Sequence, residues 1–445
     1  TFTTGSGDLG TGTLDAGGVA TYTTPSLGVG SHVVTATFSG ANFVGSTASS
    51  ITQTVNQAAT TTALASNAMA AVFGQPVVFT ATVALTAPGV VTPTGVVTFT
   101  AGASELGVVS LTTDGVATVT TSALAVGEHA IAASYSGGAN FVDSRGTLTQ
   151  TVNRAATTTA LASAANPAII GQPVVFTATV AVTAPGIVTP TGVVTFTAGA
   201  SELGVVSLTT DGVATVTTSA LAVGEHAIAA SYSGGANFVD SRGTLTQTVN
   251  RAATTTALAG EPNLAVFGQP VVFTATVAVT ATGTETPTGV VTFTAGANEL
   301  GVVPLAASSV VTVATRDLAV GDHAIVASYG GDANFVDSRA TLTQTVTQAA
   351  TTTTLTSTAS STLFGEPAIF TATVAVMAPG AGTPTGVITF TDNGAAIAGC
   401  SALAAPDGRA ACTTAILATG VHTITAAYSG DANCAAGTGT LTGGH

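Results

Sequence analysis

The feature that most constrains this chain is a sequence repeat with a period of 97 residues. The string Ala-Ala-Thr-Thr-Thr begins at Ala58, Ala155, Ala252 and Ala349, and a Gly-(Gln/Glu)-Pro segment recurs at the same interval. About 100 residues is the size of one small β-sandwich, whereas solenoid units of about 20 to 50 residues cannot bury a core alone. The repeat therefore predicts an array of domains.

The same repeat sets the expected domain boundaries. Four complete units span residues 58–154, 155–251, 252–348 and 349–445, and residues 1–57 match only the C-terminal part of a unit, with Phe2 aligned to Phe99. Because the first segment starts inside a unit, we expect the chain to be a piece of a longer protein.

Within one unit the hydrophobic pattern predicts strands and no helix. In residues 174–182 Val, Phe and Ala alternate with Thr and Ala, which is the period of a half-buried strand. Residues 203–208 and 213–217 flank Asp211-Gly212, a dipeptide that predicts a hairpin between them. About seven such strands predict an all-β sandwich in each unit. No Gly/Ser-rich or Pro-rich spacer separates the units, so we expect closely coupled domains arranged as an elongated rod.

Charge excludes several classes of partner. The chain has 7 Arg and Lys residues against 21 Asp and Glu, all seven cations are Arg, and the net charge is −14. Nucleic acid and anionic membrane surfaces are therefore not expected as partners. Thr, Gly or Pro interrupts every apolar stretch before the ~18 residues that a membrane helix needs, so this segment is not expected to insert into a membrane.

The candidate residues for chemistry are few and scattered. Each unit has one histidine in a Gly-x-His sequence, and these are His32, His129, His226, His323 and His422. A metal site or a general base would need clustered ligands or partners, and no second His or pair of carboxylates recurs at short spacing. We interpret these histidines as hydrogen-bonded to a neighbouring loop, and we predict no catalytic residue, no cofactor and no metal site, calcium at the junctions included.

A polar loop recurs after the histidine strand, as in Ser136–Phe141. Two interpretations are open. The loop could be a recognition tip, since sandwich loops at one end often bind ligands, or it could be a turn in which Gly and Asn set the backbone and Phe closes the core. We favour the turn.

The three cysteines all lie in the last unit. Cys400 and Cys412 replace Val303 and Val313 of the preceding unit, and we predict a disulfide between neighbouring strands of a hairpin. Cys434 replaces a Phe and is expected to be a buried small apolar residue.

The order Pro-Thr-Gly-Val-Val-Thr-Phe, then Leu-Ala-Val-Gly-Glu-His, then Ala-Asn-Phe, as in Pro190–Phe238, resembles the bacterial Ig-like repeat family. The resemblance covers essentially the whole chain. It implies tandem immunoglobulin-like β-sandwich domains in stalks, adhesins and appendages outside a bacterial cell, with any binding or enzyme activity in another domain. It supplies no catalytic residues to carry over. Isopeptide locking, known in related surface arrays, is excluded because the chain has no Lys.

These observations predict an extracellular structural or adhesive stalk, or a fibre-forming segment, and not an enzyme. The expected partners are neighbouring copies of the chain, in a fibre or side by side, or a ligand on a host or cell surface. The weak final strand at Thr440–His445 would favour strand exchange between copies. The alternative is a carbohydrate- or receptor-binding Ig-like module of a secreted protein, against which the 5% aromatic content and the lack of Trp argue.

Overall fold

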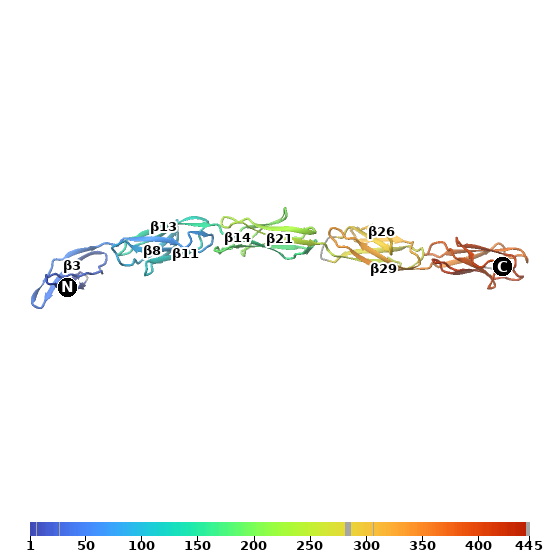
Figure 1. Ribbon diagram of the computed structural model, residues 1–445, viewed down its shortest axis with the longest axis horizontal. Coiled ribbons are helices and arrows are strands. Elements are labelled where there is room, and N and C mark those ends of the chain that lie inside the picture. Colours follow the sequence, from blue (N-terminus) through green and yellow to red (C-terminus); the bar gives the residue numbers. More distant parts are fainter. Residues whose placement is uncertain (6, 26, 281–285, 306, 442–445) are drawn as a thin grey trace. The chain divides into compact units, whose positions relative to one another are not determined.

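The computed structural model describes residues 1–5, 7–25, 27–280, 286–305 and 307–441 (Figure 1). All regular elements of these residues are strands, which confirms the all-β prediction. The same residues contain no helix that is long and apolar enough to cross a membrane. The chain divides into two compact units: Thr1–Ala164, Val175–Val216 and Ala227–Leu245 form the first, and Ala165–Val174, Thr217–His226 and Thr246–His445 form the second.

The strands follow the sequence repeat. Residues 1–57 contain β1 Phe2–Thr4, β2 Gly7–Gly10, β3 Gly30–Gly40, β4 Phe43–Thr47 and β5 Ile51–Val55. Residues 58–154 contain β6 Thr60–Ser66, β7 Ala70–Val72, β8 Val77–Leu85, β9 Val96–Ala101, β10 Ser104–Ser110, β11 Val116–Thr121, β12 Gly127–Tyr135 and β13 Ser144–Asn153. Residues 155–251 contain β14 Thr157–Ser163, β15 Ala168–Ile169, β16 Val174–Val182, β17 Val193–Ala198, β18 Ser201–Ser207, β19 Val213–Thr218, β20 Gly224–Tyr232 and β21 Ser241–Asn250.

The two later repeats continue the series. Residues 252–348 contain β22 Thr254–Glu261, β23 Leu264–Val266, β24 Val271–Val279, β25 Val290–Ala295, β26 Asn298–Pro304, β27 Val310–Thr315, β28 Gly321–Tyr329 and β29 Ser338–Thr347. Residues 349–445 contain β30 Thr351–Ser357, β31 Ala368–Val376, β32 Val387–Asp392, β33 Ala395–Ala396, β34 Leu403–Ala404, β35 Arg409–Thr414, β36 Ile424–Tyr428 and β37 Gly437–Thr440.

The repeat at residues 58–154, in the first unit, shows the sandwich. One sheet has the strand order β10-β9-β12-β13-β7 and the other has the order β11-β8-β6. Within β8 the residues Val77, Phe79 and Ala81 are buried while Thr80 and Thr82 are not, because successive side chains of a strand point to opposite faces. The short β7 pairs with the last strand β13 in parallel, a strand beyond the predicted seven.

This repeat buries a core of its own. The core cluster runs from Ala71 to Val152 and includes the fully buried Phe79 and Phe99, and every apolar residue packed against it also lies within residues 58–154. A domain with its own closed core can fold alone. The cluster in the last repeat likewise draws only on residues between Leu355 and Leu441.

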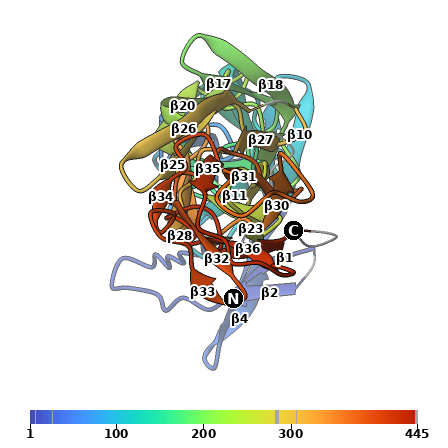
Figure 2. The same cartoon turned by 90° about the vertical axis from the view of Figure 1, so that its right-hand side faces the viewer.

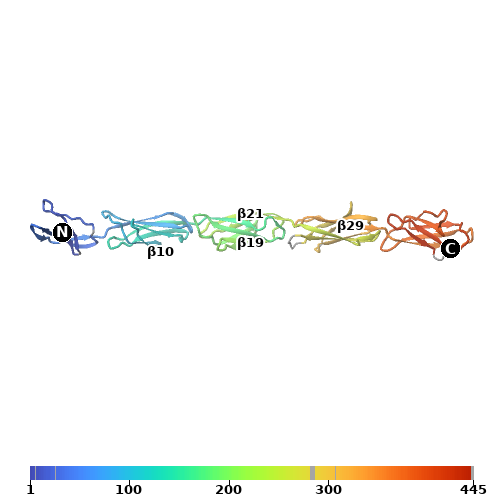
Figure 3. The same ribbon diagram turned by 90° about the horizontal axis from the view of Figure 1, so that it is seen from below.

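The second unit repeats this architecture. The sheets of residues 252–348 have the orders β22-β24-β27 and β23-β29-β28-β25-β26. Figure 2 labels β25, β26 and β28 of the larger sheet, and Figure 3 labels β29 of that sheet and β10 of the equivalent sheet in the first unit. In the last repeat the final described strand β37 has 4 residues where β29 has 10. Thr442–His445, part of the weak final strand predicted from sequence, lie outside the described residues.

The prediction of a hairpin at Asp211-Gly212 is wrong. Its flanking strands β18 and β19 belong to different sheets, as do β10 and β11 in the preceding repeat. The turn itself forms, since Gly212 has φ +75° and its N–H donates to the Thr209 carbonyl. However, the chain leaves the sheet edge after Ser207 and crosses the sandwich before it turns. The local turn chemistry is the same for a hairpin and for this crossover.

A buried amide was not predicted. The side chain of Gln150 in β13 is fully buried. Its Nε2 donates to the Ala68 carbonyl at 2.7 Å and to the Thr151 carbonyl at 2.9 Å, and its Oε1 accepts the Ser66 hydroxyl at 2.7 Å. Gln247 and Gln344 occupy the equivalent positions and are equally buried. The amide thus ties the last strand to the end of the first.

The opening segment has an open apolar side. The described residues of the segment 1–57 form a single five-stranded sheet, and none of them forms a second sheet over it. A hollow of about 660 Å³ opens on it, lined by Phe2, Leu14 and Phe38 among others. Phe43, equivalent to the core residue Phe141, is 75% exposed, whereas Phe141 is 8% exposed.

Candidate functional site

Each Gly-x-His histidine is hydrogen-bonded to the backbone of the turn that precedes it. Its Nε2 lies 2.6 to 2.7 Å from the backbone carbonyl oxygen four residues earlier, in the pairs His32 with Gly28, His129 with Ala125, His226 with Ala222, His323 with Ala319 and His422 with Ala418. A ring nitrogen that faces a carbonyl oxygen must carry the proton, so this side of the ring is a donor. The contact is local and recurs in every repeat, as a structural role requires.

The last repeat adds a charge partner to this turn. Nδ1 of His422 lies 2.7 Å from Oδ2 of Asp392, so both ring nitrogens face acceptors. The hydrogen bond to the Ala418 carbonyl, together with Asp392, raises the pKa of His422 above its usual value despite burial. In the preceding repeat Ala295 occupies the position of Asp392. This arrangement favours the imidazolium form, which suits an ion pair and not a general base.

The polar loop forms the turn that we favoured. We call residues 136–143 and their counterparts the Asn loop. In the second unit its Asp431 accepts the N–H groups of Asn433 at 2.8 Å and Cys434 at 2.7 Å through Oδ1, and that of Thr385 at 2.7 Å through Oδ2. Burial opposes the charge, yet these hydrogen bonds hold the pKa of Asp431 well below its usual value. Both oxygens of this carboxylate already accept hydrogen bonds from the backbone, so the group has a structural role in the turn.

The Asn loop also anchors the start of its repeat. The N–H of Ala58 donates to the Asn140 carbonyl at 2.9 Å, and the N–H of Val142 donates to the Ala58 carbonyl at 3.0 Å. The same pair of bonds recurs at Ala155, Ala252 and Ala349. Sequence analysis missed this role because the two partners lie far apart in the chain. The fixed interval between the Ala-Ala-Thr string and the loop was the available signal.

The residue before each starting alanine reaches into the same loop. Gln57 donates through Nε2 to the Gly138 carbonyl at 2.9 Å, and Arg154 donates through Nε to the Phe238 carbonyl at 2.9 Å, both within the first unit. In the second unit Gln348 donates to the Asp431 carbonyl at 2.6 Å, and Arg251 makes longer contacts of 3.4 and 3.5 Å with loop carbonyls. The last residue of one repeat is thus bonded to the next repeat.

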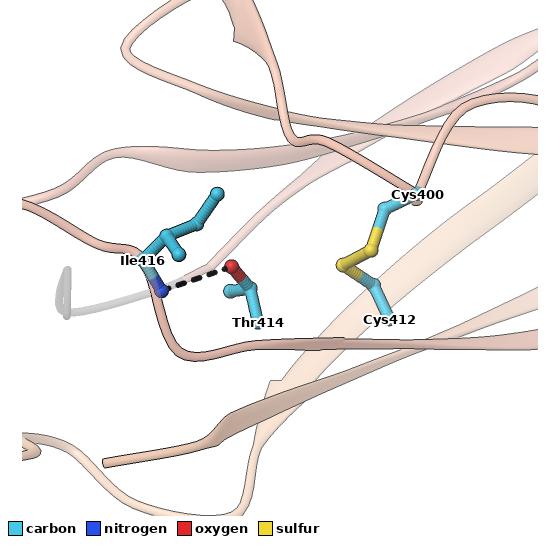
Figure 4. The surroundings of a disulfide bond; sticks show 4 residues. All are labelled: Cys400, Cys412, Thr414 and Ile416. Atoms are coloured by element: carbon cyan, nitrogen blue, oxygen red, sulfur yellow. Dashed lines mark hydrogen bonds between the residues drawn. A yellow bond between two sulfur atoms is a disulfide. The ribbon is translucent and has the colours of Figure 1, made fainter. Parts of the chain in front are cut away.

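The structure joins Cys400 and Cys412 by a disulfide bond with a Cα–Cα distance of 5.4 Å (Figure 4). The bond does not close a hairpin, contrary to our expectation. Cys412 lies in β35 of the three-stranded sheet, while the Cys400 carbonyl accepts the N–H of Phe390 in β32 of the other sheet. The disulfide therefore spans the two sheets. Cys434 is free and buried, and burial raises the pKa of its thiol to about 11.

One hollow in the second unit has few groups that would bind a ligand. This hollow, of about 620 Å³, is lined by Glu299, Arg316, Asp317 and His323 together with apolar and small polar side chains. Its lining includes no Phe, Tyr or Trp. Within the described parts of the chain no three His, Cys, Asp or Glu side chains are grouped so that they could hold a metal ion.

The chain was compared with solved structures and with protein families. The Escherichia coli adhesin FdeC is 16% identical over 64% of this chain and 96% of its own, with a TM-score of 0.24. A four-domain ectodomain fragment of ICAM-5 is 13% identical over 86% of this chain and 98% of its own, with a TM-score of 0.32. Likeness this remote supports no inference about function.

No protein with a curated description matches the chain. The sequence profile of the bacterial Ig-like domain (group 3) matches five successive segments, at residues 1–56, 63–153, 161–250, 258–347 and 355–442. These segments follow the repeat and span nearly all of the chain. The chain therefore belongs to the bacterial Ig-like domain family, as an array of tandem repeats.

Proposed function

We propose that this chain is an extracellular structural segment, the stalk or a fibre-forming part of a bacterial surface protein or appendage, with no catalytic role. Membership of the bacterial Ig-like family supports this assignment. So does the use of the recurring polar groups: the histidines and the loop aspartates are engaged in hydrogen bonds to their own turns.

The observation that carries the proposal is the pairing of β7 with β13. These strands, near the two ends of one repeat, pair in parallel at Ala70 to Thr151, Ala71 to Val152 and Val72 to Asn153. Tension applied along the chain pulls two such strands in opposite directions along their length. All of the hydrogen bonds between them then resist together, instead of opening one after another. The same parallel pair recurs as β15 with β21 and β23 with β29.

Single-molecule pulling on the full chain tests this mechanical role. We expect separate unfolding events, each of which releases a repeat of 97 residues and lengthens the chain by about 300 Å. With the disulfide closed, the event of the last repeat should be shorter, because the segment from Cys400 to Cys412, with a sequence separation of 12, stays looped. A reducing agent should restore the missing length.

A chain that extends smoothly without resisting events would contradict the proposal.

A further inference from the structure

A turn at one end of every complete repeat is built in the same way. In the Phe turn, residues 72–75 and their counterparts, the N–H of Val72 donates to Oε1 of Gln75 at 3.0 Å. The same bond joins Ile169 with Gln172, Val266 with Gln269 and Leu363 with Glu366, at 2.9 to 3.1 Å. Its glycine takes a positive φ each time, +77° at Gly74 and +87° at Gly365. The turn thus has one preformed shape in all four repeats.

In two repeats the Phe turn is covered by the next repeat. Within the first unit the ring of Phe73 meets the ring of Phe238 edge-on, with centroids 5.5 Å apart. A Cβ on Gly74 would lie 2.5 Å from Cγ2 of Val188, which shows how closely the two repeats approach. Within the second unit the Phe267 carbonyl accepts the N–H of Ala381 at 3.1 Å.

Both contacts use the same parts of the following repeat. Val188 and Ala381 lie in the loop between its second and third long strands, which we call the Pro-Gly loop (residues 86–95 and counterparts), and Phe238 lies in its Asn loop. The contact of a preformed Phe turn with the Pro-Gly loop therefore recurs, and within the first unit the Asn loop joins it through Phe238. Ile170, which takes the Phe position in the repeat at residues 155–251, is 8% exposed.

The Phe turn of the last repeat has the same shape, and no described residue covers it. Leu363 and Phe364 are each 79% exposed, and a Cβ on Gly365 would meet nothing within 4 Å. A hollow of about 190 Å³ lies beside it, lined in part by Leu417 and His422. Adjacent exposed Leu and Phe side chains on a rigid turn form an unfilled apolar contact.

We propose that the Leu363–Phe364 turn is a docking surface for the Pro-Gly and Asn loops of another complete repeat of this family. The partner is specified by the interface that already exists twice in this chain. It presents a backbone N–H to the Phe carbonyl and an aromatic ring or small apolar residues to the Phe ring. This inference does not depend on the mechanical role proposed above.

A separate repeat can test the proposal, because residues 58–154 close their own core. The probe is this repeat, labelled with ¹⁵N and carrying Phe73→Ser so that its own Phe turn cannot take part. The unlabelled full chain is added up to about millimolar concentration, since so small an interface binds weakly. We expect amide signals of residues 88–91 and 138–142 in the probe to shift or broaden.

Two variants of the full chain decide the outcome. Phe364→Ser should weaken the effect by at least about tenfold, because it removes most of the apolar contact. Ile51→Ser, which removes another exposed apolar side chain (65% exposed), should leave it unchanged. Thermal unfolding of both variants checks that they remain folded. The proposal is overturned if no signal changes, if other residues respond instead, or if Phe364→Ser acts like the unaltered chain.

Discussion

The repeats at residues 58–154 and 349–445 have the same sandwich but complete it by different means. The first closes one end of its core with Phe141 and ends in the ten-residue strand β13, which contains the buried Gln150. The last has Cys434 in place of that phenylalanine and a four-residue β37. It also has the Cys400–Cys412 disulfide and the His422–Asp392 ion pair, which the first repeat lacks.

The comparison teaches that one fold can be stabilised in two ways. The first repeat relies on apolar packing and a long paired strand. The last repeat has less of both and adds a disulfide bond and an ion pair. The disulfide joins the two sheets, and the ion pair joins the histidine turn to the end of β32. Five predictions probe how far this contrast extends, in order of expected effect.

The first repeat should depend most on its core. Phe79→Ala removes a fully buried ring and should lower the free energy of unfolding of that repeat by about 3 to 5 kcal/mol. Calorimetry of the full chain should show one transition moving to lower temperature while the others stay. Val108→Ala, at a position 53% exposed, is the control. A shift of all transitions together would mean that the repeats do not have independent cores.

The last repeat should depend on its disulfide. Replacing Cys400 and Cys412 by Ser should destabilise it by about 2 to 4 kcal/mol, because a loop of this size is no longer closed in the unfolded chain. Peptide mapping without reductant checks that the pairing, still a prediction, forms in the native protein. The double replacement by Val restores the pair present in the other repeats and should recover part of the loss. Equal loss with Ser and Val would show that sheet-to-sheet packing contributes nothing.

Gln150 should stabilise the first repeat through its buried bonds. Gln150→Ala leaves the Ala68 carbonyl and the Ser66 hydroxyl without this partner and should cost about 1 to 3 kcal/mol. Gln53→Ala, at the equivalent but exposed place in the opening segment, should have no effect beyond error. Denaturant unfolding measures both. A neutral Gln150→Ala would contradict a role for the amide in tying the first and last strands together.

The ion pair predicts a pH dependence confined to the last repeat. Since the pKa of His422 is raised in the folded state, its stabilisation is fully present below the unfolded pKa of about 6.5. It is lost as the pH rises through the folded pKa. Unfolding of the last repeat followed from pH 5 to 9 measures it. Asp392→Ala, which copies the other complete repeats, should weaken the pH dependence and leave the part that comes from the hydrogen bond to the Ala418 carbonyl. An unchanged profile would exclude the ion pair as a source.

The smallest effect is expected at the junction. Arg154→Ala removes the hydrogen bond to the Phe238 carbonyl. It should lower the free energy of unfolding of the repeat at residues 155–251 by less than about 1 kcal/mol. Amide hydrogen exchange in the Asn loop of the same repeat should become faster. Arg145→Ala, an exposed arginine within β13, is the control. Unchanged exchange in the loop would mean that the side chain does not hold it.

The strands could be predicted because they depend on local alternation. Alternate side chains from Val77 to Val83 point into the core, and this alternation can be read directly from the amino-acid sequence. The exchange of Val303 and Val313 for cysteines also pointed to two positions that lie close in space. The sheet assignment could not be predicted, because Asp211-Gly212 makes the same turn whether the next strand pairs with the previous one or crosses the sandwich.

The parts that escaped prediction are polar groups whose partners are remote in sequence. Gln150 looks like an outward-facing strand residue until the end of the first strand is placed beside it. The role of the Asn loop became visible only when Ala58 was seen to bond to it. In both cases the residue type alone indicates no special role, and the role follows from the residues that lie next to it in the folded chain.

The bonds between the first residues of a repeat and its Asn loop also have a consequence for the order of folding. The Thr60 hydroxyl donates to the Val142 carbonyl, which lies 82 residues further along the chain. A repeat that is synthesised or exported from its N-terminus cannot complete this end until most of its length has emerged. Its own loop becomes available before the nearly identical loop of the next repeat, which follows one period of 97 residues later. Sequential emergence thus favours pairing within a repeat over exchange between look-alike neighbours.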